Sequence, residues 1–248
     1  MKVGIIIQAR MTSTRLPGKV LKKVLDKPLL EYELDRLSRV SSAHKILVAM
    51  TDLDADKPIA ELCLKMNIPF YCGSENDVLK RYYDAAREFE VDVVVRVTAD
   101  CPLIDPEIVN QVVNYYLSAN GKYDYVSNVL LRTFPRGMDC EVFSRAILED
   151  VHRSAKASSD REHVTPYIYT HPKRFRLANV PCSVDKSAHR WTVDTEQDFI
   201  LIKKIIETLY PVNPNFDMMS ILHLLNARPN WVKINQDVNQ KALSGDYI

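Results

Sequence analysis

The chain has 248 residues, of which 46% are hydrophobic and 26% charged, as in globular proteins that bury a sizeable core. Lysine and arginine total 33 against 32 acidic residues, and this net charge of +1 argues against a chain-wide affinity for nucleic acid or anionic membranes. The sequence shows no long apolar stretch for membrane insertion and no signal peptide, and its five cysteines are scattered, so we expect a cytoplasmic protein without a disulfide framework or zinc site.

Strand and helix patterns alternate through the first 118 residues. An apolar run at residues 3–8 predicts a strand buried on both faces, followed by a polar loop over residues 9–19. This alternation predicts βαβ units around a mostly parallel sheet. We expect helices at 28–40, 54–66, 76–89 and 106–118, and further strands at 45–50, 69–72 and 91–98.

The pattern changes beyond residue 120. Short strands are predicted at 123–127, 138–143, 175–180 and 190–193, and helices at 144–155, 161–170, 195–209 and 217–226. No Gly/Ser/Pro-rich linker separates two halves, so residues 1–248 are expected to form a single domain. The predicted fold is a three-layer α/β/α domain with a mostly parallel central sheet and a small insertion that adds antiparallel strands. The weakly patterned tail from Arg228 is expected to lie on the surface or fray.

The loop after the first strand concentrates positive charge. Six basic side chains and no acidic one lie in the first 25 residues. Arg10, Arg15 and Lys19 are accompanied by Ser13, which supplies a hydroxyl, and by Gly18, which lets the backbone approach an anion closely. These groups suit a polyphosphate, although the loop has neither the Walker spacing nor a GxGxxG motif. A solvated basic surface is the alternative interpretation.

Two aspartates follow short strand patterns far apart in the chain. Asp100 comes after the run VVVRVTA, at the carboxyl end of a predicted strand, where open α/β sheets bind ligands. Asp194 follows the run WTV. Taken singly, each aspartate is explained equally well as a turn residue or a helix cap. If the fold brings them together, the two carboxylates suit Mg²⁺, which completes its shell with phosphate and water oxygens.

Six motifs lie in order along most of the chain: QARMTSTRLPGKVL (8–21), GSENDVLKRYYDAA (73–86), TADCPLIDP (98–106), PRGMDCEVF (135–143), REHVTPYIY (161–169) and RWTVDTEQDF (190–199). Together they resemble the cytidylyltransferases that make CMP-activated sugars, such as CMP-sialic acid and CMP-Kdo synthetases. The resemblance is stronger still to the spore coat polysaccharide biosynthesis branch of that family.

The resemblance implies that CMP is transferred from CTP to a sugar or sugar acid and that pyrophosphate is released. It implies Mg²⁺ as the cofactor, held by Asp100 and Asp194, with Arg10, Lys19 and Asp100 as catalytic residues. It also implies a homodimer, with residues 128–190 as an acceptor-side and dimerisation insertion and residues 161–180 at the interface. The candidate nucleotide-binding residues are Gln8, Ala9, Arg10, Ser13, Arg15, Lys19, Ser74 and Arg81.

Candidate acceptor-binding residues lie in the later motifs. Asp139 and Glu141 alternate in a strand-like run, so they share one face and can accept hydrogen bonds from sugar hydroxyls, although a solvent-facing edge strand explains them equally well. Glu162 and His163 are expected to open a helix, with His163 as a proton carrier or a capping group. Ser74 and Arg81 flank the start of another helix, where Arg81 either contacts nucleotide or pairs with Asp77 or Asp84. The full acceptor set is Ser127, Asn128, Asp139, Glu141, Glu162 and His163.

Two other functions compete with this interpretation. Asp52, Asp54 and Asp56 form two overlapping DxD triplets, the pattern by which glycosyltransferases of similar fold hold a metal ion and a nucleotide sugar. Asp54 is equally suited to cap a helix, and such enzymes do not require the RLPGK loop. A nucleotide-binding module without catalytic activity is the second alternative.

Overall fold

A computed structural model describes residues 1–240. Its central sheet contains seven strands in the order β5-β4-β1-β6-β8-β7-β9. All neighbouring strands run parallel except at the β6–β8 and β8–β7 pairs, so only β8 runs against the others. The strands are β1 (Val3–Gln8), β4 (Lys45–Thr51), β5 (Phe70–Gly73), β6 (Val93–Thr98), β7 (Tyr125–Ser127), β8 (Glu141–Ser144) and β9 (Leu177–Asn179).

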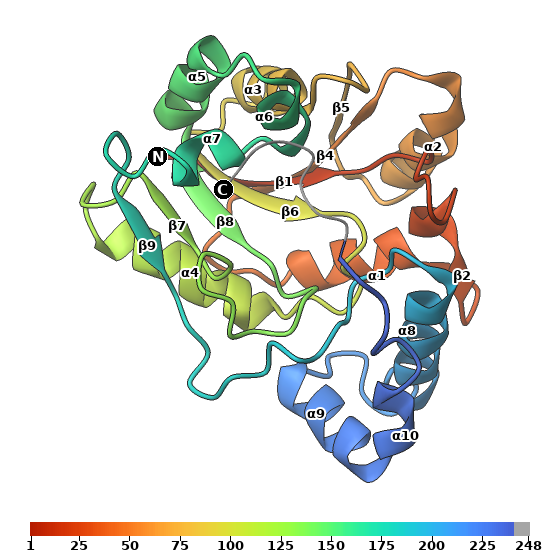
Figure 1. The fold of residues 1–248 in the computed structure, drawn as a ribbon. Helices are drawn as coiled ribbons and strands as arrows, with labels where there is room; N and C mark the ends of the chain where they lie inside the picture. The colour runs from red at the N-terminus through yellow and green to blue at the C-terminus, as the bar shows by residue number, and fades with distance from the viewer. Residues whose placement is uncertain (241–248) are drawn as a thin grey trace.

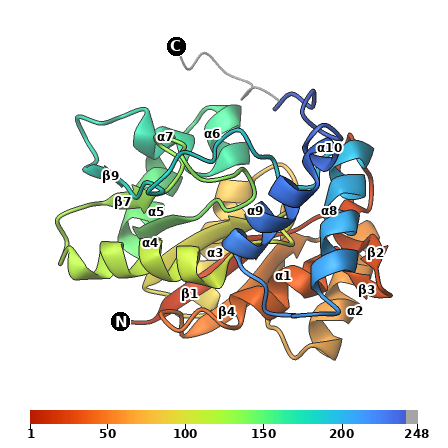
Figure 2. The ribbon, with the colours of Figure 1, turned by 90° about the horizontal axis from the view of Figure 1, so that it is seen from below.

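Helices cover both faces of the sheet (Figures 1 and 2). On one face pack α1 (Leu29–Leu37), α2 (Lys57–Lys65) and α4 (Pro106–Ser118). On the other face lie α3 (Val78–Glu88), α5 (Arg145–Ser154), α6 (Ser158–His163) and α7 (Pro166–Tyr169). The expected three-layer fold with a mostly parallel sheet is therefore confirmed.

A third apolar cluster forms beside the sheet. It gathers α8 (Glu196–Leu209), α9 (Met218–Ala227) and α10 (Pro229–Val232), which stand together in Figures 1 and 2. The remaining short elements are the 3₁₀ turns η1 (Lys19–Leu21) and η2 (Asp54–Asp56) and an antiparallel hairpin of β2 (Lys23–Val24) and β3 (Lys27–Pro28). None of the helices described over residues 1–240 is both long and apolar enough to cross a membrane.

The register of β1 and β6 positions the functional segments. Both strands are almost wholly buried, and the parallel pairing places Gln8 opposite Thr98. The basic loop that follows β1 and the segment that carries Asp100 after β6 therefore leave the sheet side by side. This is the carboxyl edge of the parallel strands, where α/β sheets bind ligands.

Two local predictions were wrong, and a third was confirmed in one of its two alternatives. Residues 190–193 form no strand, because their pairing is limited to a single bridge between Arg136 and Arg190. The predicted helix over 161–170 is divided into α6 and α7, because Val164 adopts φ 73° and Pro166 starts a new helix. The tail beyond Arg228 was expected to lie on the surface or fray. Over its described part it lies largely on the surface, and Trp231 and its neighbours pack against the third apolar cluster.

Candidate functional site

The basic loop after β1 is held at both of its ends. Gly18 adopts φ 70° and donates its backbone N–H to the Met11 carbonyl at 2.8 Å, which closes the loop. The Met11 N–H donates in turn to Asp56 Oδ1 at 2.7 Å. Glycine suits this left-handed conformation because it has no Cβ to clash. The closed loop leads directly into η1, whose first residue is Lys19.

The Lys19 ammonium joins the two aspartates predicted to hold a metal ion. Its Nζ lies 2.7 Å from Asp100 Oδ2 and 2.7 Å from Asp194 Oδ1. The two carboxylate oxygens are therefore no farther apart than twice that distance. The side chains of Lys19, Asp100 and Asp194 are only 11%, 20% and 15% exposed. The fold thus brings together three residues that the sequence places far apart.

Asp194 reaches this position through an irregular segment pinned by backbone hydrogen bonds. The Trp191 N–H donates to the Arg136 carbonyl at 2.7 Å, and the Val193 N–H donates to the Asp100 carbonyl at 2.8 Å. Gly137 permits the approach, because a Cβ at its φ of 103° would lie 2.6 Å from the Trp191 carbonyl carbon. These bonds fix the backbone on either side of the two acids.

Cationic side chains surround the two aspartates, and they keep Asp100 ionised. Although burial opposes ionisation, the Lys19 ammonium and a hydrogen bond from Thr98 lower the pKa of Asp100 to about 2. Burial acts to lower the pKa of Lys19, but the two carboxylates raise it overall. Asp194 Oδ2 also lies 2.8 Å from both Arg15 and Arg190. Both carboxylates are therefore surrounded by cations.

The two carboxylates fit a divalent cation. Their oxygens converge on a cationic nitrogen, and carboxylate oxygen is the ligand that Mg²⁺ prefers. The described part of the chain holds no cluster of three or more His, Cys, Asp or Glu side chains suited to a metal ion. An ion at Asp100 and Asp194 would therefore depend on substrate phosphate and water for its other ligands, which is the usual arrangement for Mg²⁺. The Lys19 ammonium bonds the same carboxylate oxygens and would compete with the metal ion for them.

A cavity of about 600 Å³ extends from these acids toward the amino end of β8. Several hydroxyl and aromatic side chains line it, including those of Thr165, Tyr169 and Thr192. Its size suits a nucleotide-sized or sugar-sized ligand. Seven of the predicted site residues line the cavity: Gln8, Arg15, Asp100, Asp139, Glu141, His163 and Asp194.

Carboxylates on the far side of the cavity have arginine partners of their own. Arg96, from β6, forms an ion pair with Glu141, which also accepts hydrogen bonds from the hydroxyls of Tyr125 at 2.5 Å and Thr165 at 2.7 Å. The Arg132 guanidinium donates two hydrogen bonds, of 2.6 and 2.7 Å, to the Asp139 carboxylate. These bidentate and multiply bonded pairs fix the carboxylates in place.

Three predicted acceptor residues lie away from the cavity lining. Ser127 and Asn128 are fully buried. The Asn128 side chain donates to the Met138 carbonyl at 2.7 Å and accepts from the Cys140 N–H at 2.9 Å, so it braces the loop before β8. Glu162 is exposed. Both Glu162 and His163 were expected to open a helix, but they lie at the end of α6.

The remaining nucleotide candidates lie around the basic loop. Ala9 is buried and donates its N–H to the Ala49 carbonyl, whereas Ser13 is partly exposed and does not line the cavity. Arg10 Nη1 lies 3.7 Å from a Glu75 carboxylate oxygen.

Ser74 and Arg81 lie at the start of α3. Arg81 is 2% exposed and donates to the Ser74 carbonyl at 3.0 Å, so it pairs with neither Asp77 nor Asp84. Asp77 instead forms an ion pair with Arg161 of α6.

Sequence reasoning missed three cavity arginines, Arg96, Arg132 and Arg136. Arg96 gave a usable signal, because it is the one charged residue in the apolar run VVVRVT, and a buried charge needs a partner. Arg132 and Arg136 lie in the irregular loop between β7 and β8, where no periodicity indicates the direction of a side chain.

The DxD triplets do not form a metal site of the glycosyltransferase kind. The Asp54 side chain is 92% exposed and pairs with Lys57. Asp56 is 1% exposed, and its carboxylate accepts hydrogen bonds from the Met11 N–H and from Thr51. The Asp56 carboxylate therefore holds the basic loop and is not free to bind a metal ion.

Comparisons with known proteins agree with the resemblance to cytidylyltransferases that the sequence motifs show. A family model described as cytidylyltransferase matches residues 4–211. The spore coat polysaccharide biosynthesis protein SpsF of Bacillus subtilis is 31% identical over 232 residues, which cover 91% of this chain and 94% of that protein.

Solved structures agree with this match. A cytidylyltransferase from Leptospira borgpetersenii serovar Hardjo-bovis superposes with a TM-score of 0.90 at 34% identity, covering 98% of this chain and 100% of that one. A CMP:2-keto-3-deoxy-manno-octonic acid synthetase complexed with CTP gives a TM-score of 0.65 at 14% identity, over 84% of this chain and 100% of that one. At 14% sequence identity, the match to this second structure shows a similar fold and nothing more.

Proposed function

Because this chain belongs to the cytidylyltransferase family, we propose that it transfers CMP from CTP to a hydroxyl group of a sugar or sugar acid and releases pyrophosphate, in the synthesis of a surface polysaccharide. The observation that carries the proposal is the meeting of Lys19, Asp100 and Asp194 beside the basic loop. Two similar proteins support the substrate classes, because one is named a polysaccharide biosynthesis protein and the other is a synthetase complexed with CTP.

In this proposal the basic loop binds the triphosphate. Arg10, Arg15 and Lys19 neutralise the β- and γ-phosphates, which gain charge as pyrophosphate leaves. Asp100 and Asp194 would hold Mg²⁺, which would supply further charge neutralisation at the phosphates. The acceptor occupies the part of the cavity near Asp139 and Glu141, from which its hydroxyl reaches the α-phosphate in line with the leaving group.

Lys19 has two alternative sets of partners in this scheme. Without ligands its ammonium bonds the same carboxylate oxygens that would hold the metal ion. We expect the ammonium to leave those oxygens for the pyrophosphate oxygens when CTP and the metal bind. In the free protein, the lysine thereby offsets the electrostatic repulsion between the two carboxylates. In the complex, it stabilises the leaving pyrophosphate.

The proposal includes a homodimeric, cytosolic enzyme that does not bind nucleic acid. The family resemblance and the near-neutral charge support these features. Light scattering on the purified protein tests the dimer, and substitutions on the exposed surface of residues 161–180 test the proposed interface.

A pyrophosphate-release assay tests the reaction itself. The four nucleoside triphosphates are crossed with ulosonic acids, sugar phosphates and phosphorylated polyols. We expect release to require a nucleotide, Mg²⁺ and an acceptor together, with CTP preferred, and to be lost in Asp100→Asn. Asp54→Asn is the matched control, because Asp54 is exposed and outside the cavity. Turnover of a nucleotide sugar that depends on Asp54 would contradict the proposal and favour a glycosyltransferase.

A further inference from the structure

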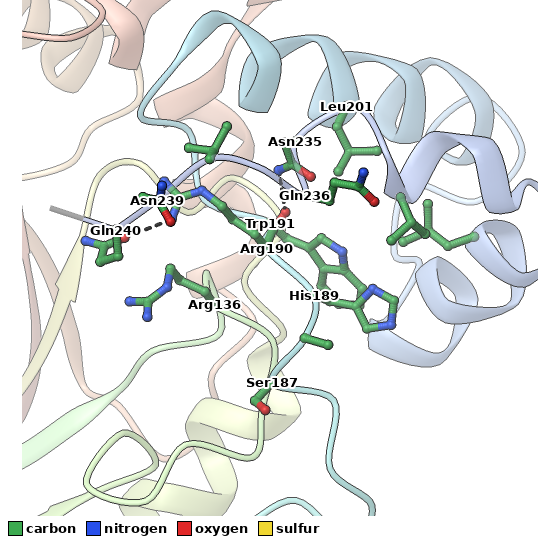
Figure 3. A pocket seen from close by; sticks show the side chains of 14 residues that line it. Arg136, Ser187, His189, Arg190, Trp191, Leu201, Asn235, Gln236, Asn239 and Gln240 are labelled. Carbon is green, nitrogen blue, oxygen red and sulfur yellow. Dashed lines mark hydrogen bonds between the residues drawn. The ribbon is translucent and has the colours of Figure 1, made fainter.

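The C-terminal segment of residues 235–240 contacts the side chains that hold Asp194, although it lies outside the matched family region. The cytidylyltransferase model matches residues 4–211, so the segment follows that region in the chain. Asn235 is 3% exposed, and its amide nitrogen donates to the Arg190 carbonyl at 2.9 Å and to Asp198 Oδ1 at 2.8 Å. Figure 3 shows Asn235 beside the backbone of Arg190. One buried amide thus ties the C-terminal segment to the residues on either side of Asp194.

Asp198, in the first turn of α8, is the centre of this network. The residue is fully buried, and its Oδ2 accepts hydrogen bonds from the backbone N–H groups of Asp194 and Thr195, at 3.0 Å each. Its Oδ1 accepts from Arg190 Nε at 2.9 Å as well as from Asn235. Charge-assisted bonds of this kind are strong and directional. The Asp198 carboxylate therefore holds the backbone of Asp194 and the guanidinium of Arg190 in one arrangement.

The Arg190 guanidinium extends this arrangement to the Asp194 carboxylate. Arg190 Nη2 lies 2.8 Å from Asp194 Oδ2, and Arg15 Nη2 lies at the same distance from that oxygen. The other oxygen, Oδ1, bonds the Lys19 ammonium, which it shares with Asp100. Because two guanidiniums hold Oδ2, Oδ1 is the oxygen that faces Asp100 across the candidate cation position.

Two further contacts join the C-terminal segment to the same two arginines. The Gln240 side-chain oxygen accepts from Arg190 Nη1 at 2.8 Å, and the Asn239 backbone carbonyl accepts from Arg15 Nη1 at 3.3 Å. Figure 3 shows Gln240 close to the end of the Arg190 side chain. Both arginines that bond Asp194 therefore have a partner in residues 235–240.

We propose that Asn235, assisted by Gln240, is a positioning residue that fixes the direction of the Asp194 carboxylate through Asp198 and Arg190. It thereby sets the affinity of the site for the divalent cation that accompanies the nucleotide. The inference rests on the proposed function, since it takes Asp194 as a ligand of that cation. Groups that orient a metal ligand contribute to metal affinity even though they do not touch the metal. The functional unit then extends beyond residue 211 into the C-terminal segment.

Mn²⁺ binding in the presence of CTP, followed by electron paramagnetic resonance, tests the positioning. Asn235→Leu removes both amide donors, and we expect it to raise the dissociation constant for Mn²⁺ roughly 10-fold. Gln240→Ala should raise it by less, because Arg190 keeps its bonds to Asp198. In both variants the kcat for pyrophosphate release should fall while the KM for the acceptor stays unchanged.

Two more variants separate orientation from folding. Asn235→Asp keeps the shape of the side chain but places a second carboxylate against Asp198, so it should weaken Mn²⁺ binding more than Asn235→Leu does. Gln236→Ala is the matched control for Gln240→Ala, because both glutamines are exposed and Gln236 does not line the cavity. If the Asn235 variants do not fold, Gln240→Ala decides the matter, since the loss of an exposed side chain leaves the core intact.

The outcomes separate this inference from the proposed function. Circular dichroism establishes the temperatures at which each variant is folded. Wild-type Mn²⁺ binding and pyrophosphate release, with unchanged Mn²⁺ affinity in Asn235→Leu and Gln240→Ala, would overturn the inference alone. A loss of affinity confined to temperatures at which Asn235→Leu unfolds would assign Asn235 a purely structural role and also overturn it. A wild-type protein that neither binds Mn²⁺ with CTP nor releases pyrophosphate would refute the proposed function, and the inference with it.

Discussion

The two ends of the cavity hold their carboxylates in different ways. At the Lys19 side, formed by Lys19, Asp100 and Asp194, one ammonium is shared between two acids. At the Glu141 side, formed by Asp139 and Glu141 with their partners, each acid has an arginine of its own. Glu141 additionally receives two hydroxyl hydrogen bonds.

This difference indicates which side rearranges when ligands bind. A cation shared between two acids can be replaced by another cation with little loss, because the carboxylates exchange one partner for another. The Arg96–Glu141 pair is 13% and 8% exposed, and breaking such a pair leaves a charge buried without a partner. We therefore expect substitutions at the Lys19 side to affect catalysis and metal binding, and substitutions at the Glu141 side to affect stability first.

The largest expected effect is that of Asp100→Asn. Loss of one of the two carboxylates should lower kcat on the order of 1000-fold, because metal-assisted charge stabilisation contributes several kcal/mol. The melting temperature should change little, since Lys19 keeps Asp194 as its partner. Pyrophosphate release and thermal unfolding measure the two quantities. A variant with a lowered melting temperature but normal turnover would assign Asp100 a structural role. It would contradict the proposed difference between the two sides of the cavity.

Lys19→Met should lower kcat on the order of 100-fold through loss of leaving-group stabilisation. It should also leave two facing carboxylates without their shared cation. We therefore expect Mg²⁺ added without nucleotide to raise the melting temperature of Lys19→Met more than that of the wild-type protein. Lys23→Met, an exposed lysine on β2, is the control. Equal stabilisation of all three proteins by Mg²⁺ would show that Lys19 and the metal do not compete.

Glu141→Gln tests the other side. The amide still accepts from Tyr125 or Thr165 but no longer neutralises Arg96, so we expect a loss of about 2 kcal/mol in the free energy of unfolding. Denaturant titration measures it. Glu149→Gln breaks an exposed ion pair with Arg153 and should cost far less. Equal, small losses in both variants would erase the proposed difference between the two sides.

The smallest effect concerns Glu33, a fully buried residue of α1 that accepts the Cys101 N–H at 3.0 Å behind the Lys19 side. Burial and the nearby Asp100 raise the pKa of Glu33 well above its usual value. The unfolded chain then releases this proton at lower pH than the folded chain does, so stability falls as pH rises between the two pKa values. In metal-free buffer Glu33→Gln should gain stability relative to wild type as pH increases from 5 to 8. A stability difference independent of pH would contradict this origin.

The sequence predicted the parts of the site that follow from regular strands. Apolar runs located β1 and β6, and their parallel pairing placed the basic loop beside Asp100. The resemblance paired Asp100 with Asp194, but the path of the chain to Asp194 was not predictable, because the 190–193 segment is held by isolated backbone bonds instead of a strand ladder. The bonds from Asn235 to Arg190 and Asp198 join segments far apart in the chain, so no local pattern reveals them.

Ser127 and Asn128 illustrate the opposite case. Their polar side chains at the end of a short strand suggested contact with a sugar, yet both are fully buried and Asn128 braces the backbone before β8. A buried amide with local backbone partners and an amide aimed at a ligand have the same sequence signal. Only the direction of the side chain in the fold distinguishes them.

Titration with Mn²⁺, followed by electron paramagnetic resonance, tests most directly whether Asp100 and Asp194 act together on one cation. We expect the wild-type protein to bind Mn²⁺ weakly alone and much more tightly with CTP, and both Asp100→Asn and Asp194→Asn to lose the CTP-dependent binding. Unchanged Mn²⁺ binding in either variant would contradict the two-acid site on which the account depends.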